Sequence, residues 1–89
     1  MPFAYKLFLT NQARKELAKI QKGNLKAAQA ISNALNQLEY DPDAGEFLHG
    51  DLKGRRKLRA GNYRIVYSIE KKNLIILIFR IAHRKEAYR

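Results

Sequence analysis

Three strands are predicted by the second half of the chain, where residues 57–79 read KLRAGNYRIVYSIEKKNLIILIF. Apolar and polar side chains alternate from residue 52 onward, the period of a half-buried strand. The triplets Ala60-Gly61-Asn62 and Lys71-Lys72-Asn73 consist of turn-forming residues. The run Leu74–Phe79 is apolar at every position, as in a central strand buried on both faces. This half therefore predicts three antiparallel strands.

The first half of the chain predicts one further strand and a helical hairpin. Residues 3–9 alternate like a strand. Apolar residues then recur at spacings of three and four, the helical period, at Ala13, Leu17, Ile20, Leu25, Ala28, Ile31, Leu35 and Leu38. Thr10 or Asn11 is suited to cap the first helix and Asn24 the second, because a short side-chain oxygen accepts hydrogen bonds from free N–H groups. The second helix is expected to end near Tyr40.

These elements predict an α+β fold with the order β-α-α-β-β-β. The helical hairpin packs on one face of an antiparallel-dominated sheet, and a short tail follows. A length of 89 residues is that of one domain, spanning 1–89. The longest apolar run is far below the roughly 20 residues of a membrane span. The N-terminus also lacks a signal-peptide pattern. We therefore expect a soluble cytoplasmic protein with no membrane partner.

The net charge of +10 lies almost entirely in the second half. Residues 1–50 contain six basic and five acidic residues, a net of +1, whereas residues 51–89 contain twelve and three, a net of +9. Between Leu52 and Ile69 there is no acidic residue. Such a one-sided field indicates nucleic acid, an anionic surface or an acidic protein as the partner.

Strand alternation gathers much of this charge on one face. Four basic residues share it: Lys53, Arg55, Lys57 and Arg59. A two-residue loop at Ala60-Gly61 would place Arg64 of the next strand opposite Lys57. Like charges directly opposite each other destabilise a sheet, so the cluster is better explained as an anion site than as scaffolding. Arg binds phosphate in a bidentate manner and Lys binds it as a point charge.

Several chemistries are disfavoured by what the sequence lacks. There is no Cys, which removes disulfides, thiol catalysis and Cys-based zinc sites, and the two His residues are too few for a typical metal site. The carboxylates near residues 39–46 are interpreted as a solvated helix end. Since no paired carboxylates face the basic strand, a two-metal nuclease is disfavoured. We expect neither a metal nor a cofactor.

Aromatic and histidine side chains supply further candidates. Tyr63 and Tyr67 are more easily explained by core packing than by base stacking. Tyr88 lies in a polar tail, which favours stacking on an unpaired base. His83 is suited either to proton transfer or to a turn in which its ring bonds the backbone.

Two segments resemble a known family. KLRAGNYRIVY at 57–67 and HRKEAYR at 83–89 are similar to RelE-type toxins of the RelE/ParE toxin–antitoxin superfamily, and the order of elements also matches. The resemblance implies a single RelE-like toxin domain that enters the ribosomal A site and cleaves mRNA without a metal. In that reaction the 2′-hydroxyl attacks the adjacent phosphate and leaves a 2′,3′-cyclic phosphate and a 5′-hydroxyl.

The resemblance also implies roles for individual residues. Lys57 and Arg64 would hold the scissile phosphate, Arg84 would lie near the leaving oxygen, and Tyr88 would stack on the substrate. A second set is assigned to RNA or phosphate binding: Lys53, Arg55, Arg56, Arg59 and Arg80.

One position departs from the family pattern. Arg55 stands where RelE has a lysine proposed for proton transfer, and a guanidinium remains protonated. Either His83 takes over proton transfer, or charge stabilisation alone supports a slow reaction that the ribosome accelerates by orienting the RNA.

Two other functions stay open at this point. A ParE-like inhibitor of DNA gyrase would have the same fold without nuclease chemistry, and an inactive basic RNA-binding relic would keep the charge alone. Both toxin interpretations imply a cognate acidic, helix-forming antitoxin, and the nuclease also implies the ribosome and mRNA. Operator DNA would be bound only through the antitoxin complex.

Overall fold

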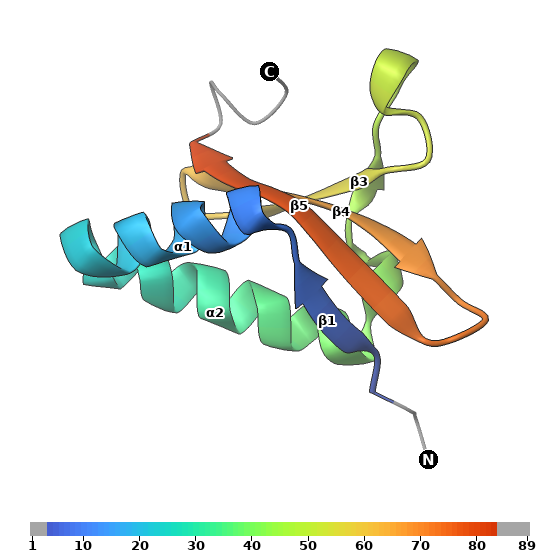
Figure 1. Cartoon of the computed structure of the whole chain (residues 1–89), viewed down its shortest axis with the longest axis horizontal. Helices are drawn as coiled ribbons and strands as arrows, with labels where there is room; N and C mark the ends of the chain where they lie inside the picture. Colours follow the sequence, from blue (N-terminus) through green and yellow to red (C-terminus); the bar gives the residue numbers. More distant parts are fainter. Residues whose placement is uncertain (1–3, 84–89) are drawn as a thin grey trace.

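The computed structural model describes residues 4–83, in which two helices cover one face of a five-stranded sheet (Figure 1). The main elements are β1 (Lys6–Leu9), α1 (Asn11–Gly23), α2 (Leu25–Tyr40), β2 (Glu46–Phe47), β3 (Arg56–Ala60), β4 (Tyr63–Glu70) and β5 (Ile75–His83). Short 3₁₀ turns, Pro42–Ala44 and Gly50–Leu52, flank β2. The strand order is β1-β5-β4-β3-β2; β1 is parallel to β5 and the other pairs are antiparallel. The predicted α+β class is confirmed.

Side-chain caps fix the start of both helices. The Thr10 hydroxyl oxygen accepts a hydrogen bond from Ala13 N–H at 3.1 Å, and the Asn24 carbonyl oxygen accepts one from Ala27 N–H at 3.0 Å. The Thr10 hydroxyl also donates to the Phe79 carbonyl oxygen at 3.0 Å, which ties the beginning of α1 to β5. Neither helix is long and apolar enough to cross a membrane, among the residues that the structure describes.

The core lies between the helical hairpin and one face of the sheet. Its fully buried members include Ile31 and Leu38 of α2, Tyr67 of β4, and Ile76 and Ile78 of β5. Cross-strand partners lie on the same face, so the alternate residues of β3 and β4 point away from the helices. A small second cluster lies on that open face, formed by Leu48, Val66, Phe79 and Ala82.

The β3–β4 register differs from the predicted one by two residues. The turn is Gly61-Asn62 rather than Ala60-Gly61, so Arg59 pairs with Arg64 and Lys57 pairs with Val66. Gly61 has φ +62°, a conformation that Ala60 would reach only with strain. Because the shift is an even number, Lys57 and Arg64 remain on one face as diagonal neighbours.

Two further predictions about the middle of the chain were wrong. The expected loop at 43–50 contains β2, which pairs with the outer edge of β3. The strand expected from residue 52 begins at Arg56, so Lys53 lies in the preceding loop and off the strand face.

Candidate phosphate-binding site

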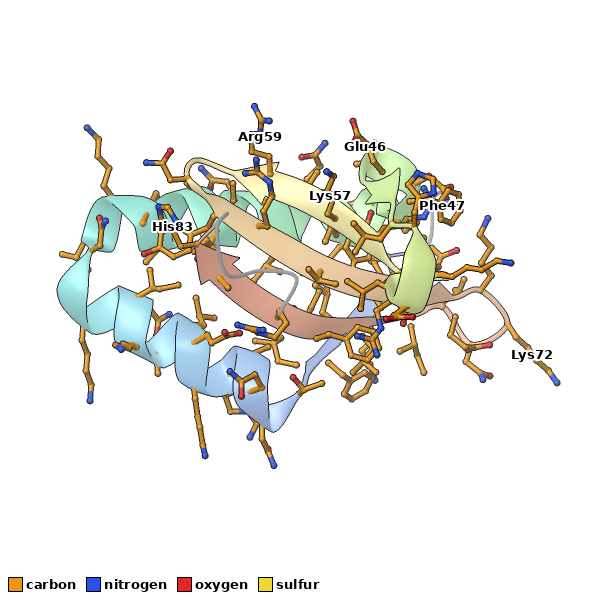
Figure 2. The ribbon with its side chains drawn as sticks, turned by 90° about the horizontal axis from the view of Figure 1, so that it is seen from above. Glu46, Phe47, Lys57, Arg59, Lys72 and His83 are labelled. Carbon is orange, nitrogen blue, oxygen red and sulfur yellow. The ribbon has the colours of Figure 1, made fainter. Side chains whose placement is uncertain are left out.

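The open face of the sheet carries a small cationic cavity at the β2–β3 border. Three cationic side chains and one carboxylate line this cavity of about 350 Å³: Lys57, Arg59, Arg64 and Glu46. Figure 2 shows Lys57, Arg59 and Glu46 at the same border of the sheet, far from Lys72. Two of the residues assigned to the scissile phosphate, Lys57 and Arg64, are therefore brought together. A phosphate dianion or a phosphorane in this cavity would meet positive charge from two strands.

Glu46 is the residue that the sequence interpretation missed. It pairs with Lys57 in the β2–β3 register, and its carboxylate lies 4.0 Å from the Lys57 ammonium. The Glu46 side chain is 82% exposed and that of Lys57 34%, so their ion pair is weak and the carboxylate is open to a ligand. A two-residue strand leaves almost no periodic signal, which is why Glu46 was grouped with a solvated helix end.

A buried tyrosine anchors the loop that carries Glu46. The Tyr67 hydroxyl donates to the Pro42 carbonyl oxygen at 2.7 Å and accepts from Gly45 N–H at 2.9 Å. Burial raises the pKa of Tyr67 above its usual value, so the hydroxyl stays protonated and remains a donor. A Cβ on Gly45 would lie 2.5 Å from the Tyr67 oxygen and 2.6 Å from the Lys57 carbonyl oxygen. Only glycine fits this approach without a shift of the neighbouring backbone.

Arg56, the cross-strand partner of Tyr67, also holds this loop. Its guanidinium donates to the Gly45 carbonyl oxygen at 3.0 Å, forms an ion pair with Asp43 at 3.0 Å, and lies 3.9 Å over the ring of Phe47. The Arg56 side chain is 15% exposed. We therefore assign Arg56 to loop anchoring rather than to RNA. Together, Tyr67 and Arg56 fix the backbone on both sides of Glu46, which keeps its side chain near Lys57.

The other predicted site residues that the structure describes lie outside this cavity. Arg55 stacks over Phe79 at 3.8 Å, on the open face, and Lys53 is exposed in its loop. Arg80 is held by Glu16 of α1 through contacts of 2.8 and 2.9 Å. Arg84 and Tyr88 fall outside the described residues.

His83 is separated from the cavity by the sheet. Its cross-strand partner is Tyr63, and both lie on the helix-facing side, whereas Arg64 points to the open face. This geometry does not favour proton transfer by His83 at the phosphate. Within residues 4–83, no group of three or more His, Cys, Asp or Glu residues is placed to hold a metal ion.

Comparison with known proteins defines the class. Residues 7–88 match the family described as the ParE toxin of the type II toxin–antitoxin system parDE. Toxin RelG of Mycobacterium tuberculosis is 31% identical over 86 residues, which cover 96% of this chain and 97% of that protein. The fold and these matches define a toxin of a type II toxin–antitoxin system.

Two solved structures lead to the same assignment. The toxin–antitoxin complex RelBE2 of Mycobacterium tuberculosis is similar with a TM-score of 0.76 and 30% identity, covering 91% of this chain and 99% of that one. The RelE–RelB complex of Pyrococcus horikoshii gives a TM-score of 0.72 and 25% identity, covering 96% and 100%. The chain belongs to the RelE/ParE toxin superfamily.

Proposed function

We propose that this toxin is a ribosome-dependent mRNA interferase that cleaves mRNA in the A site. The observation that carries the proposal is the open-face cavity, where Lys57, Arg59 and Arg64 surround a space of about 350 Å³ beside the Glu46 carboxylate. An inhibitor that acts by binding alone has no need of a carboxylate held against a cationic phosphate site.

In the proposed reaction the scissile phosphate occupies this cavity. The 2′-oxygen of the preceding ribose attacks phosphorus, the bond to the 5′-oxygen breaks, and negative charge develops on the phosphorane. Lys57 and Arg64 stabilise that charge from fixed positions, which is the main source of rate enhancement in sites of this kind. The 2′-hydroxyl proton must leave during attack, and the leaving 5′-oxygen must gain one. Arg84, by resemblance, lies near the leaving oxygen and stabilises its charge, while solvent water supplies the proton, because a guanidinium does not release one.

Glu46 is the proton acceptor that this geometry favours. Arg55 is excluded because a guanidinium stays protonated, and His83 lies on the other face of the sheet. Glu46 is the only carboxylate among the described residues that line the cavity. Its exposure gives it access to a substrate hydroxyl, and the Tyr67 and Arg56 contacts limit how far its loop moves.

We expect Glu46→Gln to lower the A-site cleavage rate by about 10²- to 10⁴-fold, the usual contribution of a general base. The amide preserves shape but removes proton acceptance together with one negative charge beside Lys57, so ribosome binding is not expected to weaken. Single-turnover cleavage on programmed ribosomes measures the rate. Asp51→Asn, which alters an exposed carboxylate outside the cavity, is the matched control. A wild-type rate for Glu46→Gln contradicts the assignment.

The function itself is tested by two assays on the wild-type chain. We expect cleavage of mRNA on ribosomes with an occupied P site, with 2′,3′-cyclic phosphate and 5′-hydroxyl ends that primer extension and end-labelling detect. We expect no inhibition of supercoiling by purified DNA gyrase at the same toxin concentration. Intact mRNA together with blocked supercoiling would reverse the assignment.

Gyrase inhibition is the second candidate, because the matching family is described as the ParE toxin. The relatives whose names contain RelE or RelG, and the cavity itself, favour the nuclease. We give the nuclease precedence on the geometry of Glu46 and Lys57.

A cognate antitoxin is the partner that both candidates require. The solved relatives RelBE2 and RelE–RelB are themselves toxin–antitoxin complexes. We propose an acidic, helix-forming antitoxin, because this chain carries a net charge of +10. Its apolar contacts would include Leu48 and Phe79, the partly exposed members of the open-face cluster, which neither α1 nor α2 covers.

A further inference from the structure

A groove crosses the end of the molecule opposite the β4–β5 turn. It consists of two hollows of about 600 and 250 Å³ that share Asn24 and Tyr63 in their walls. The larger hollow lies between α1 and the end of β5, and the smaller one lies between α2 and the Gly61-Asn62 turn. Because they adjoin at Asn24 and Tyr63, an extended ligand is able to occupy both. We call this feature the end groove.

The charge of the end groove is positive. Three exposed lysines line it: Lys15, Lys19 and Lys26. None of them forms an ion pair with another residue of the described part of the chain. Glu16 is the one carboxylate among the described residues that line the groove, and it is occupied, since it accepts from the Arg80 guanidinium and, at 2.9 Å, from Ile81 N–H. Lysines that form no ion pair, beside a carboxylate that is already occupied, favour the binding of a polyanion.

Two aromatic rings, those of Tyr63 and His83, also line the end groove. Tyr63 and His83 are half-buried, and their ring centroids lie 5.8 Å apart at 77°, an edge-to-face pair. This contact holds both rings in place and leaves each partly exposed to the groove. A fixed ring between cationic side chains is the arrangement that binds an unpaired base together with its flanking phosphates.

Consecutive residues of β4 connect the end groove with the proposed cleavage site. Tyr63 faces the groove, and the next residue, Arg64, faces the phosphate cavity on the other side of the sheet. The Gly61-Asn62 turn separates the two sites, and a Cβ at Gly61 would meet no atom within 4 Å. A single strand that passes around this exposed turn reaches both.

We propose that the end groove binds single-stranded RNA that flanks the cleaved nucleotide, with a base stacked on His83, whose ring Tyr63 holds edge-to-face, and phosphates on Lys15 and Lys19. The proposal rests on the proposed mRNA cleavage for the identity of the strand. An acidic peptide is the competing occupant. The ring pair favours RNA, because a base has a flat face that stacks on a ring and an acidic side chain has none.

The test measures binding without cleavage and without ribosomes. The full-length protein is titrated into a fluorescein-labelled 2′-O-methyl oligouridine of ten nucleotides, which lacks the attacking hydroxyl, and anisotropy gives the Kd from 50 to 200 mM salt. Lys15→Gln/Lys19→Gln is compared with Lys6→Gln/Lys72→Gln. The control pair removes the same charge, and neither of its lysines lines the groove; Figure 2 shows Lys72 far from His83.

We expect the groove pair to weaken binding at least tenfold, and the control pair less than twofold. The groove pair should also reduce the slope of log K against log salt by about 1.4, since each phosphate contact contributes roughly 0.7 for a single strand. His83→Ala should weaken binding about fivefold or more, through lost stacking, with the slope unchanged.

Three results would overturn the groove assignment. Equal losses from the two lysine pairs would show general attraction. Unchanged binding in the groove pair and in His83→Ala would show that RNA lies elsewhere. If a decaglutamate peptide binds as tightly as the RNA, and the groove variants weaken its binding to the same extent, the partner would be an acidic protein. The ribosome assays on the wild-type protein test the nuclease activity independently. If cleavage is absent but RNA binding depends on the groove, the proposed nuclease activity is rejected and the groove assignment stands.

Discussion

Replacement of Arg64 by alanine is expected to reduce A-site mRNA cleavage by about 10²- to 10³-fold, the usual effect of removing one group that stabilises developing charge. Lys57→Ala is expected to have an effect of the same size. The two side chains reach the cavity from adjacent strands, diagonal to each other, so each contributes charge that the other does not replace. Single-turnover cleavage on programmed ribosomes measures both.

A conservative variant separates the effect of the Arg64 charge on the cleavage rate from the effect of its side-chain geometry. Arg64→Lys keeps a cation but loses bidentate geometry, so we expect an intermediate rate. Lys72→Ala removes a cation from the exposed β4–β5 turn and should leave the rate unchanged. Thermal unfolding of each variant establishes that the fold is intact. If Arg64→Ala cleaves at the wild-type rate, the cavity is not the cleavage site.

Tyr67→Phe is expected to lower the free energy of unfolding by about 1–3 kcal/mol, because it leaves Gly45 N–H and the Pro42 carbonyl without their buried partner. Gly45→Ala should destabilise by a similar or larger amount, since its Cβ would meet the Tyr67 oxygen and the Lys57 backbone. Denaturant unfolding monitored by circular dichroism measures both.

The same variants should reduce cleavage although neither residue touches the substrate in our proposal. Loss of the anchor lets the Glu46 loop move relative to Lys57, and small displacements of a reacting group cost tenfold or more in rate. The loss should appear in kcat with KM nearly unchanged. Tyr63→Phe removes a hydroxyl from a half-buried ring of the same strand and should change stability by less than about 0.5 kcal/mol. Full activity in Tyr67→Phe would show that the anchor serves stability alone.

The sequence predicted those elements whose signals are local. Thr10 and Asn24 cap the helices as expected because capping depends on a few neighbouring residues. The strand alternation also placed Lys57 and Arg64 on one face correctly. The register was missed by two residues because a positive φ at Gly61, rather than the apolar pattern, decides where the hairpin turns. The pairing of β1 with β5 depends on contacts between the two ends of the chain, which no local pattern encodes.

The candidate site was predictable only in part, for a related reason. Parity along a strand identifies which residues share a face, but not which cations are already paired. Arg56 is engaged by Asp43 and Arg80 by Glu16, each across 13 residues or more of sequence. Glu46 reaches Lys57 through a two-residue strand whose loop is held by Tyr67 and Arg56, contacts that no local pattern encodes. The roles of Arg84 and Tyr88 stay predictions.

The position of β5 has a consequence for how the toxin is made. This strand lies between β1 and β4 and supplies three of the fully buried or nearly buried isoleucines, yet it is the last strand in sequence. β1 therefore has no partner until residues 75–78 have been synthesised, and pairing between such distant segments is slow. The cavity residues on β3 and β4 lack a supporting sheet until then. In a protein proposed to attack ribosomes, this order of assembly delays activity until translation of the toxin's own message has passed β5.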